Sequence, residues 1–299
     1  MSQKKSSALP PQLKIARTAG FCFGVKRAVK LAEEAPERYP GKTIFTLGPI
    51  IHNPQVVERL ARMGIHETSS EALEGLGNGV IIIRSHGIVR KLAQKLAEHP
   101  DLTVVDATCP FVRRAQEIVA QMSNEGYEVL ILGEPDHPEV AGLLSYGNPN
   151  HTRVVTAPDD LPEGLLQTRK PLRLALLAQT TQTQELFDQV ALKLLSLKGE
   201  LRCFNTICTA TSNRQAEVLE LASACDCMLI IGGRNSANTN HLHELSLSRQ
   251  ANSHHIETAA DLQPEWYAKA NTIGISAGAS TPQWLIDEIA SKIKRGANL

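Results

Sequence analysis

Short apolar runs alternate through the chain with longer segments in which apolar residues recur every third or fourth position. The runs favour buried strands, and the spacing predicts amphipathic helices, best defined over residues 25–32, 112–122 and 218–222. Strands that alternate with helices at this density are typical of parallel sheets joined by right-handed crossovers. We therefore predict an α/β protein.

The same order of elements occurs three times. Each copy has a strand that ends in a cysteine-bearing turn, a helix, a strand that ends in glycine, a polar turn with a second helix, and a further strand with another polar turn. The cysteines are Cys22, Cys109 and Cys208, and a basic residue follows early in each helix: Arg27, Arg114 and Arg214. Because the intervals are nearly equal and domain-sized, we expect three similar α/β domains with mostly parallel sheets around a pseudo-threefold axis.

The repeat also predicts the domain boundaries. We expect domains over residues 24–108, 109–207 and 208–295, with residues 13–23 added to the third domain. Residues 1–12 are expected to form a disordered tail.

Each repeated cysteine stands between a strand and the start of a helix. Ligands bind beyond the carboxyl ends of parallel strands, and a helix N-terminus favours the thiolate, which is the form that binds metal. If the three copies pack around one axis, Cys22, Cys109 and Cys208 meet at a common metal centre. The other cysteines lie in or beside strand-like segments and are expected to be buried thiols without a ligand role: Cys203, Cys225 and Cys227.

Three widely separated thiolates fit more than one kind of centre. A structural zinc usually takes a fourth ligand and short paired spacings, and no C-x2-C pair occurs here. A four-iron cluster tolerates long separations, and three cysteines leave one of its irons open to a substrate oxygen. Spacing alone does not choose between the cluster, zinc and three unrelated buried thiols.

The composition of the chain limits which partners and which cellular compartment we expect. The 31 Lys and Arg residues balance 31 Asp and Glu residues, so no net field attracts nucleic acid or an anionic membrane. No apolar run approaches the roughly 20 residues that span a bilayer, and the first residues lack the apolar core of a signal peptide. We expect a cytoplasmic protein with reduced cysteines and with neither a nucleic-acid nor a membrane partner.

The remaining polar turns carry histidines and neutral donors. Gathered around helix N-termini, such side chains suit a phosphate or diphosphate, although each one taken singly is also expected as a turn or cap residue. The residues are His52, His86, His137, Gln179, Thr180, Thr181, Ser236, Asn238 and Ser280. Glu139 follows His137 near the start of a helix, where a carboxylic acid can pass protons to a reacting oxygen; a helix-cap role is the alternative.

These residues resemble the 4-hydroxy-3-methylbut-2-enyl diphosphate reductase family, which performs the last step of the non-mevalonate isoprenoid pathway. The resemblance runs over nearly the whole chain, from about residue 13 to residue 290. The motifs that support it are "GFCFGVKRA", "IIHNPQVV", "SHG", "DATCP", "HPEV", "AQTT", "ICTATSNRQ", "NSANTN" and "AGAS". Each motif alone is weak, and together they are highly specific.

The resemblance implies three α/β domains around a central metal cluster. This would be one 4Fe-4S cluster per chain, held by Cys22, Cys109 and Cys208, with one iron not ligated by cysteine. It also implies a diphosphate site, with two further residues beside the substrate hydroxyl. The diphosphate residues are His52, His86, His137, Ser236, Asn238 and Ser280, and the hydroxyl-side residues are Thr180 and Glu139. The implied reaction is the two-electron, two-proton reductive dehydroxylation of (E)-4-hydroxy-3-methylbut-2-enyl diphosphate, an allylic diphosphate, to isopentenyl and dimethylallyl diphosphates. Ferredoxin, or flavodoxin with a reductase, would supply the electrons.

Two positions depart from the family pattern. Ala237 stands where many members have serine, so we keep it as a weaker binding position that can still offer its backbone N–H. Phe23 stands where some members have a small residue, which would alter cluster packing and solvent access. Two other functions remain open: a hydro-lyase whose cluster transfers no net electrons, and a zinc-holding protein that binds a phosphorylated metabolite. A requirement for a reductant would exclude the hydro-lyase. A coloured protein would exclude the zinc-holding protein, because a zinc protein is colourless.

Overall fold

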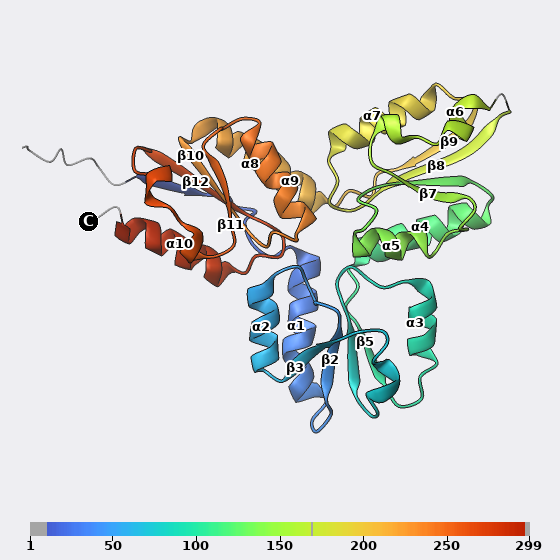
Figure 1. Ribbon diagram of the computed structural model, residues 1–299, viewed down its shortest axis with the longest axis horizontal. Coiled ribbons are helices and arrows are strands. Elements are labelled where there is room, and N and C mark those ends of the chain that lie inside the picture. The colour runs from blue at the N-terminus through green and yellow to red at the C-terminus, as the bar shows by residue number, and fades with distance from the viewer. Residues whose placement is uncertain (1–10, 169, 297–299) are drawn as a thin grey trace, which may run out of the picture. The chain divides into compact units, whose positions relative to one another are not determined.

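Three four-stranded parallel sheets organise the computed structural model, which describes residues 11–168 and 170–296 (Figure 1). The first sheet contains β2 (Ile44–Leu47), β3 (Ile65–Thr68), β4 (Val80–Ile83) and β5 (Thr103–Asp106). The second contains β6 (Glu128–Leu132), β7 (Thr152–Val155), β8 (Leu172–Ala178) and β9 (Gly199–Phe204). The third contains β1 (Gln12–Ile15), β10 (Cys227–Ile231), β11 (Ser253–Ile256) and β12 (Thr272–Ala277).

All three sheets share one topology. Their strand orders are β3-β2-β4-β5, β7-β6-β8-β9 and β11-β10-β12-β1, and every pairing is parallel. The strand that leads to each repeated cysteine therefore lies at an edge of a sheet, as β5, β9 or β1. This identity of order confirms the α/β class and the threefold repeat that the sequence predicts.

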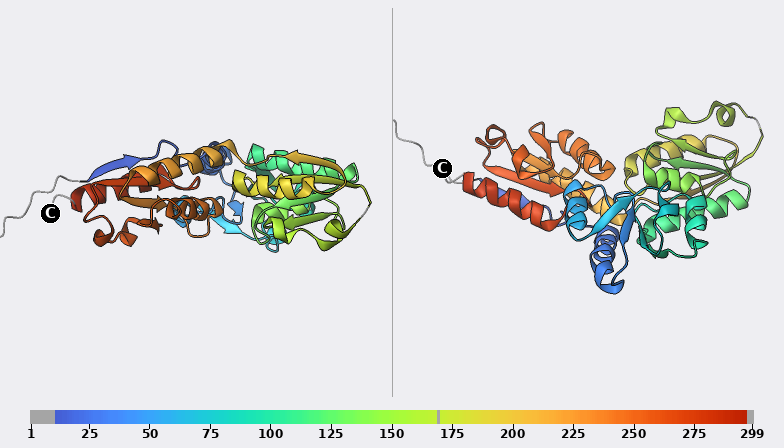
Figure 2. Two further views of the ribbon diagram at one scale, coloured as in Figure 1. Left: turned by 90° about the horizontal axis from the view of Figure 1, so that it is seen from above. Right: turned by 60° about the horizontal axis from the view of Figure 1, so that its bottom comes forward.

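Helices cover both faces of the sheets, as Figure 2 shows. The first sheet is accompanied by α1 (Phe23–Arg38), α2 (Pro54–Arg62) and α3 (Arg90–Ala97). The second has α4 (Pro110–Asn124), α5 (Pro138–Leu144), α6 (Glu163–Gln167) and α7 (Gln184–Leu195). The third has α8 (Thr209–Ala224), α9 (Ala237–Leu247) and α10 (Gln283–Gly296). Short 3-10 turns lie at Leu73–Gly75, Pro158–Asp160, Ala259–Asp261 and Pro264–Trp266.

The central strands are buried on both faces, which explains their continuous apolar sequences. Every residue of β4 and of β10 is buried. In the second sheet, Val119 of α4 belongs to the hydrophobic cluster on one face, and Phe187 of α7 belongs to the cluster on the other. Strands covered on both faces favour uninterrupted runs of Val, Ile and Leu over alternation with polar residues.

One expectation about the cysteines is wrong. Cys225 and Cys227 are buried as predicted, but Cys203 is exposed. Cys203 lies on β9, which pairs with β8 alone among the described strands and is therefore an edge strand. An apolar-looking strand sequence does not reveal whether the strand is central or peripheral.

The chain divides into two compact units, one formed by residues up to Phe21 together with those from Asn213, and the other by Cys22–Ser212. The unit Cys22–Ser212 holds the first and second sheets, and the other unit holds the third sheet. The predicted boundaries of three domains remain a prediction. Most of the predicted tail at residues 1–12 lies outside the described residues, although Gln12 already belongs to β1.

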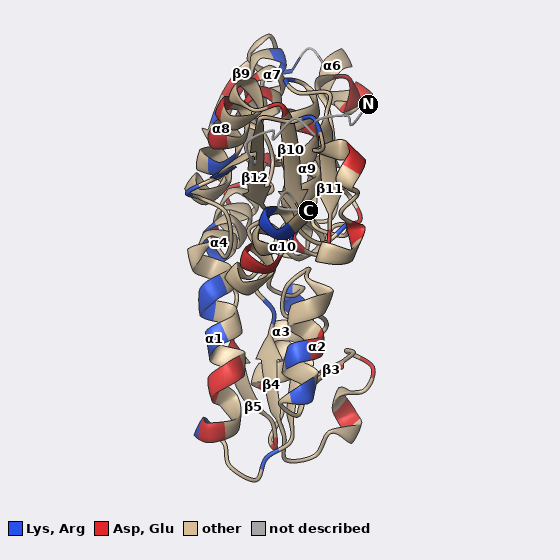
Figure 3. Cartoon of the chain, turned by 90° about the vertical axis from the view of Figure 1, so that its left-hand side faces the viewer, with Lys and Arg blue, Asp and Glu red and all other residues tan. Residues whose placement is uncertain are grey.

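Acidic and basic side chains are distributed over the helices, and Figure 3 shows both signs of charge on α1. Within the described part of the chain, no helix combines the length and the apolar character needed to cross a membrane.

Candidate active site

Cys22, Cys109 and Cys208 are brought together within the unit Cys22–Ser212. Cys22 is the N-cap of α1, Cys109 is the N-cap of α4, and Cys208 directly precedes α8. All three are half-buried, and both other thiols lie close enough to raise the pKa of Cys109. The convergence predicted from the repeat is therefore present in the structure.

The first turn of α1 packs directly on Cys109. A Cβ atom at Gly24 would lie 2.5 Å from the Cys109 Sγ atom, so only glycine permits this approach. The Arg27 guanidinium donates hydrogen bonds to the backbone oxygens of Asp106 and Thr108, at 3.1 and 3.3 Å. These contacts hold α1 against the segment that carries Cys109.

Burial raises the pKa of the Cys109 thiol to about 11, while the backbone amides of Phe111 and Val112 lower it and the two neighbouring thiols raise it. The helix N-terminus favours the thiolate, as the sequence predicts, but desolvation outweighs that effect. Metal binding at Cys109 would therefore displace a proton, because the thiolate is the ligand.

The thiols and the histidines offer different donors for a metal centre. Among the described residues, one group of His, Cys, Asp and Glu side chains is compact enough for a single ion, and it consists of histidines and no cysteine. Thiolates are the usual ligands of iron-sulfur clusters, and the three thiols lie close enough for both neighbours to influence Cys109. The three thiols therefore fit the expected cluster.

The compact group consists of His52, His86 and His137, whose ligating nitrogens all lie within 4.8 Å of one another. The His52 and His86 ring centroids are 4.5 Å apart, and His137 is 5.6 Å from each. His52 precedes α2, His86 follows β4, and His137 is the N-cap of α5. The structure thus unites three predicted site residues at the ends of neighbouring elements.

Burial favours the neutral form of His52 and His86. It lowers the pKa of His52 and places that of His86 well below its usual range, with further lowering of the His86 pKa by the other two imidazoles and by Arg84. The Nδ1 atom of His86 has no hydrogen-bond partner among the described residues. His137 accepts the Glu139 N–H at Nδ1, at 3.1 Å, which leaves the proton of a neutral ring on Nε2. Neutral imidazoles of this kind can donate hydrogen bonds to an anion.

Glu139 and Thr180 form a buried pair. The Thr180 N–H donates to Glu139 Oε1 at 2.7 Å, and the Thr180 hydroxyl donates to Oε2 at 2.8 Å. Burial raises the pKa of Glu139, which is 1% exposed, to about 7; the bonds from Thr180 lower it and Glu134 raises it. The carboxylate bonds to a separate segment and the cap of α5 is His137, so its hydrogen bonds are not those of a helix cap.

Backbone bonds join these groups to the cysteines. The Cys109 N–H donates to the oxygen of Ser85, which precedes His86, at 2.9 Å. The Cys208 N–H donates to the oxygen of Thr180 at 3.0 Å. By contrast, the side-chain amide of Gln179 bonds to other protein groups: it accepts the Glu134 N–H at 2.9 Å and donates to the Thr181 hydroxyl at 3.0 Å. Gln179 and Thr181 therefore shape the turn that carries Thr180.

A second group of predicted residues lies in the other compact unit, at the carboxyl ends of the adjacent strands β10 and β12. Ser236 is the N-cap of α9 and accepts the Thr239 N–H at 3.3 Å. Ala237 is the first residue of α9, where backbone N–H groups have no intrahelical partner. Asn238 is 5% exposed, and neither polar atom of its side chain has a partner among the described residues. Ser280 is buried just after β12. A buried, unpaired amide points to a ligand, because leaving it unsatisfied costs about 1–3 kcal/mol.

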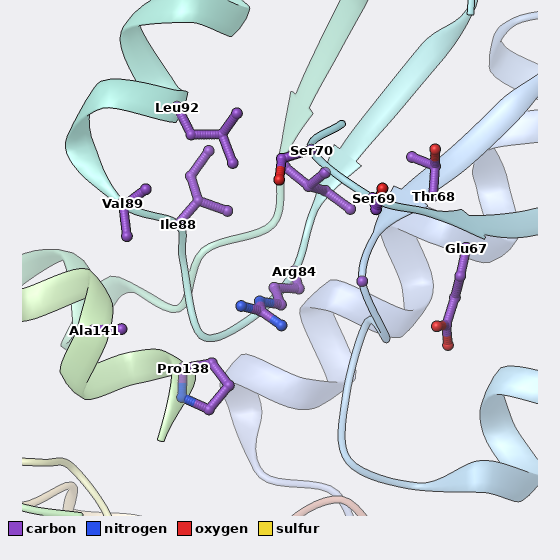
Figure 4. A pocket seen from close by; sticks show the side chains of 12 residues that line it. Glu67, Thr68, Ser69, Ser70, Arg84, Ile88, Val89, Leu92, Pro138 and Ala141 are labelled. Carbon is purple, nitrogen blue, oxygen red and sulfur yellow. The ribbon is translucent and has the colours of Figure 1, made fainter. Parts of the chain in front are cut away.

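Sequence reasoning missed Arg84, which follows β4 directly before the motif "SHG". Its side chain reaches into a pocket of about 480 Å³, with Leu92, Ile88 and Val89 along one wall (Figure 4). No carboxylate of a described residue lies within 4 Å of its guanidinium, and its charge lowers the pKa of His52 and of His86. Position beside a recognised motif was the signal that could have identified this cation.

Gln116 was also missed. It is 4% exposed on the buried face of α4, and its Nε2 atom has no hydrogen-bond partner among the described residues. A Cβ atom at Gly87 would lie 2.7 Å from that nitrogen, so Gln116 packs against the turn that carries His86. A polar residue between Ala115 and Val119 on a predicted apolar stripe was the available signal.

Comparison with known proteins identifies the family to which this chain belongs. The model of the LytB protein family matches residues 13–294. The chain belongs to the LytB family. A relative from Geobacter sulfurreducens, 48% identical over 288 residues, covers 96% of this chain and 98% of its own, and it is named 4-hydroxy-3-methylbut-2-enyl diphosphate reductase. A relative from Aquifex aeolicus with the same name is 46% identical over 282 residues, which are 94% of this chain and 95% of its own.

Two solved structures of the LytB-type reductases also match. One, described as (E)-4-hydroxy-3-methyl-but-2-enyl diphosphate reductase, the terminal enzyme of the non-mevalonate pathway, has a TM-score of 0.70 and 44% identity, and the match covers 95% of this chain and 99% of that one. The other, an E-1-hydroxy-2-methyl-but-2-enyl-4-diphosphate reductase from Plasmodium falciparum, has a TM-score of 0.84 and 26% identity, with coverage of 95% and 88%. These matches confirm the resemblance, and with it the α/β fold class.

Proposed function

We propose that this protein is a reductase that converts (E)-4-hydroxy-3-methylbut-2-enyl diphosphate into isopentenyl and dimethylallyl diphosphates. Family membership and the names of the relatives support the enzyme class. The observation that carries the proposal is that three half-buried thiols adjoin a buried acid, Glu139, and its partner Thr180. The hydrogen bond from the Cys208 N–H to the Thr180 backbone oxygen joins the two groups.

Cys22, Cys109 and Cys208 would hold one 4Fe-4S cluster, and no cysteine would ligate its fourth iron. When bound, such a cluster supplies electrons together with an open iron that acts as a Lewis acid on the substrate hydroxyl. Helices α1 and α4 suit an anionic centre, because neither helix has an acidic residue in its first turn, and Arg27 and Arg113 lie near the two N-termini.

The diphosphate would be bound by neutral donors and one cation. His52, His86 and His137 offer imidazole N–H groups, and Arg84 adds the positive charge that these neutral rings lack. We propose that Ser236, Asn238, Ser280 and the backbone N–H of Ala237 also bind the diphosphate, because they occupy the equivalent strand ends of the third sheet.

Glu139 would provide the proton that the departing hydroxyl needs. Its pKa of about 7 keeps a substantial fraction protonated near neutrality, and Thr180 orients both carboxyl oxygens. In the complete reaction the C–O bond breaks, water leaves, and two electrons with a second proton form a C–H bond on the allylic carbon chain. We further propose that ferredoxin or flavodoxin delivers the electrons, and that the reaction takes place in the cytoplasm.

Cysteine substitutions test this assignment. Ser at position 22, 109 or 208 should abolish cluster absorbance and turnover after anaerobic reconstitution, whereas Cys203→Ser and Cys227→Ser should retain both. Iron and sulfide content, together with turnover of the allylic diphosphate under a chemical reductant, are the measurements. Equal loss of the cluster in both groups of variants would remove the three cysteines as its ligands. Turnover without any reductant would instead indicate a hydro-lyase.

A further inference from the structure

Two exposed aromatic rings flank the cysteine site. Phe23 is 67% exposed and Phe111 is 45% exposed, although large apolar side chains are usually covered. Phe23 directly follows Cys22 in the first turn of α1, and Phe111 is the second residue after Cys109 in the first turn of α4. Gly24 and Cys109 bring these two turns into contact, so both rings belong to one region of the unit Cys22–Ser212.

Basic residues follow each ring in the same helix. Lys26 and Lys30 follow Phe23 at helical spacing and therefore lie on the same side of α1. Arg114 follows Phe111 by three residues on α4, and Arg113 lies beside it. We call these six side chains the docking face: Phe23, Lys26, Lys30, Phe111, Arg113 and Arg114.

The placement of these charges works against helix stability. Cations near a helix N-terminus are unfavourable, because they face the positive end of the helix dipole. On α1 the basic residues nevertheless precede the acidic ones, so that blue residues occupy one half of this helix and red residues dominate the other (Figure 3). Lys26 has no carboxylate of a described residue within 4 Å, whereas Lys30, Arg113 and Arg114 pair with Glu34, Asp106 and Glu117 in exposed bridges. Exposed bridges of this kind are weak and easily exchanged for other partners.

We propose that the docking face binds an acidic, low-potential one-electron carrier protein. The inference rests on the proposed function, since a carrier has a purpose here only if Cys22 and Cys109 hold a redox group. An apolar centre with a charged rim is the usual anatomy of a protein interface, and complementary charge raises the association rate. The chain has no net charge, so the local cations favour a shaped acidic partner over a polyanion or an anionic bilayer.

The electron balance agrees with this partner. Each turnover consumes two electrons and two protons, breaks one C–O bond, forms one C–H bond and releases water. Two reduced carriers would each be oxidised by one electron. A carrier that docks, transfers an electron and leaves needs modest affinity, and a small face with a charged rim provides it.

Binding of the carrier is the first test, because it does not depend on catalysis. The cluster-loaded protein would be titrated calorimetrically, without oxygen, with a plant-type ferredoxin and separately with a flavodoxin. The double variant Lys26→Glu/Arg114→Glu should raise the Kd at least tenfold, and its affinity should depend less on salt. Lys91→Glu, an exposed charge reversal on α3 of the same unit, is the matched control and should leave the Kd unchanged.

The rings are tested separately by Phe23→Ser and Phe111→Ser. Each should weaken carrier binding several-fold without changing its salt dependence, since the ring carries no charge. Cluster absorbance is recorded first for every variant, and a variant that loses its cluster is replaced by Lys26→Gln or Phe23→Leu. Unchanged Kd values in the charge and ring variants would overturn the proposal, as would equal weakening by Lys91→Glu.

Turnover with two reductants separates this proposal from the function on which it rests. With dithionite the double variant should retain the parent rate, whereas with the carrier its KM for the carrier should rise at least tenfold. A matching loss with both reductants would show that the substitutions damage the site itself and would overturn the docking face. A parent protein inactive with both reductants would refute the proposed function, while the calorimetric result would still decide whether the face binds the carrier.

Discussion

Glu139 combines burial with a pKa near neutrality, and both follow from its position at the start of α5, with its carboxylate turned toward Thr180. The folded-state pKa of about 7 lies above the ordinary value of 4.5. The unfolded chain therefore releases this proton at lower pH than the folded chain. The stabilisation associated with the protonated acid is complete below the unfolded pKa and is lost as pH rises through the folded pKa.

The substitution Glu139→Gln should remove this pH dependence. In the parent protein, ionisation of Glu139 should lower the free energy of unfolding by on the order of 3 kcal/mol between about pH 4.5 and pH 7. The variant should lack this decline. Chemical denaturation across that pH range measures it. The same variant should keep its cluster, while single-turnover reduction falls 10²- to 10⁴-fold, as expected when an acid is lost. A prereduced variant that turns over at the parent rate would exclude Glu139 as the proton source.

Elements are positioned by contacts that leave no room for a side chain, and α1 gives the sharpest case. Its N-terminal turn reaches Cys109 only because residue 24 is glycine. The α1–α4 contact is thus set at a backbone position, and the hydrogen bonds of Arg27 to the residues before Cys109 reinforce it.

Gly24→Ala should displace α1 from α4 and weaken the cluster site. The added methyl would lie 2.5 Å from the Cys109 sulfur and 3.2 Å from its Cβ atom, so either the sulfur must leave its position or α1 must shift. We expect iron and sulfide content to fall to less than half of the parent value, with far-UV circular dichroism unchanged. Gly164→Ala on α6 is the control, because a Cβ atom there meets nothing within 4 Å. Full cluster loading in Gly24→Ala would show that this contact does not position Cys109.

Across the molecule, the three cysteines connect distant parts of one compact unit. Cys22 opens the unit, Cys109 precedes α4, and Cys208 lies near the end of the unit. A group held by all three would stabilise the folded unit, because the unfolded chain cannot present the three thiolates together.

Removal of the metal should therefore lower the thermal stability of the protein. We expect the Tm measured anaerobically by calorimetry to fall by several degrees when the reconstituted cluster is stripped with a chelator and an oxidant. Cys109→Ser should show the lower Tm from the outset and no further loss on the same treatment. An unchanged Tm after complete loss of iron would mean that the cysteines do not bridge the unit through a common group.

Much of this architecture is encoded in local patterns. Buried runs such as β4 and β10 and the helical spacing of Val112, Ala115 and Val119 predict parallel α/β units, because periodicity reflects the face that an element buries. The repeated cysteine turns predict three ligands, and the histidine and serine motifs predict an anion site. Family resemblance supplies the reaction, since motif combinations of this length are specific even where single residues are not.

Other properties depend on neighbours that are remote in the chain. The edge position of β9, for example, exposes Cys203. The pKa of Glu139 arises from burial, and Arg84 and Gln116 gain their interest only from the groups packed around them. Residue identity and periodicity thus determine which chemistry is available. Long-range packing decides the desolvation, the spacing of the sulfurs and the exposure of each side chain, because these depend on atoms brought together only by folding.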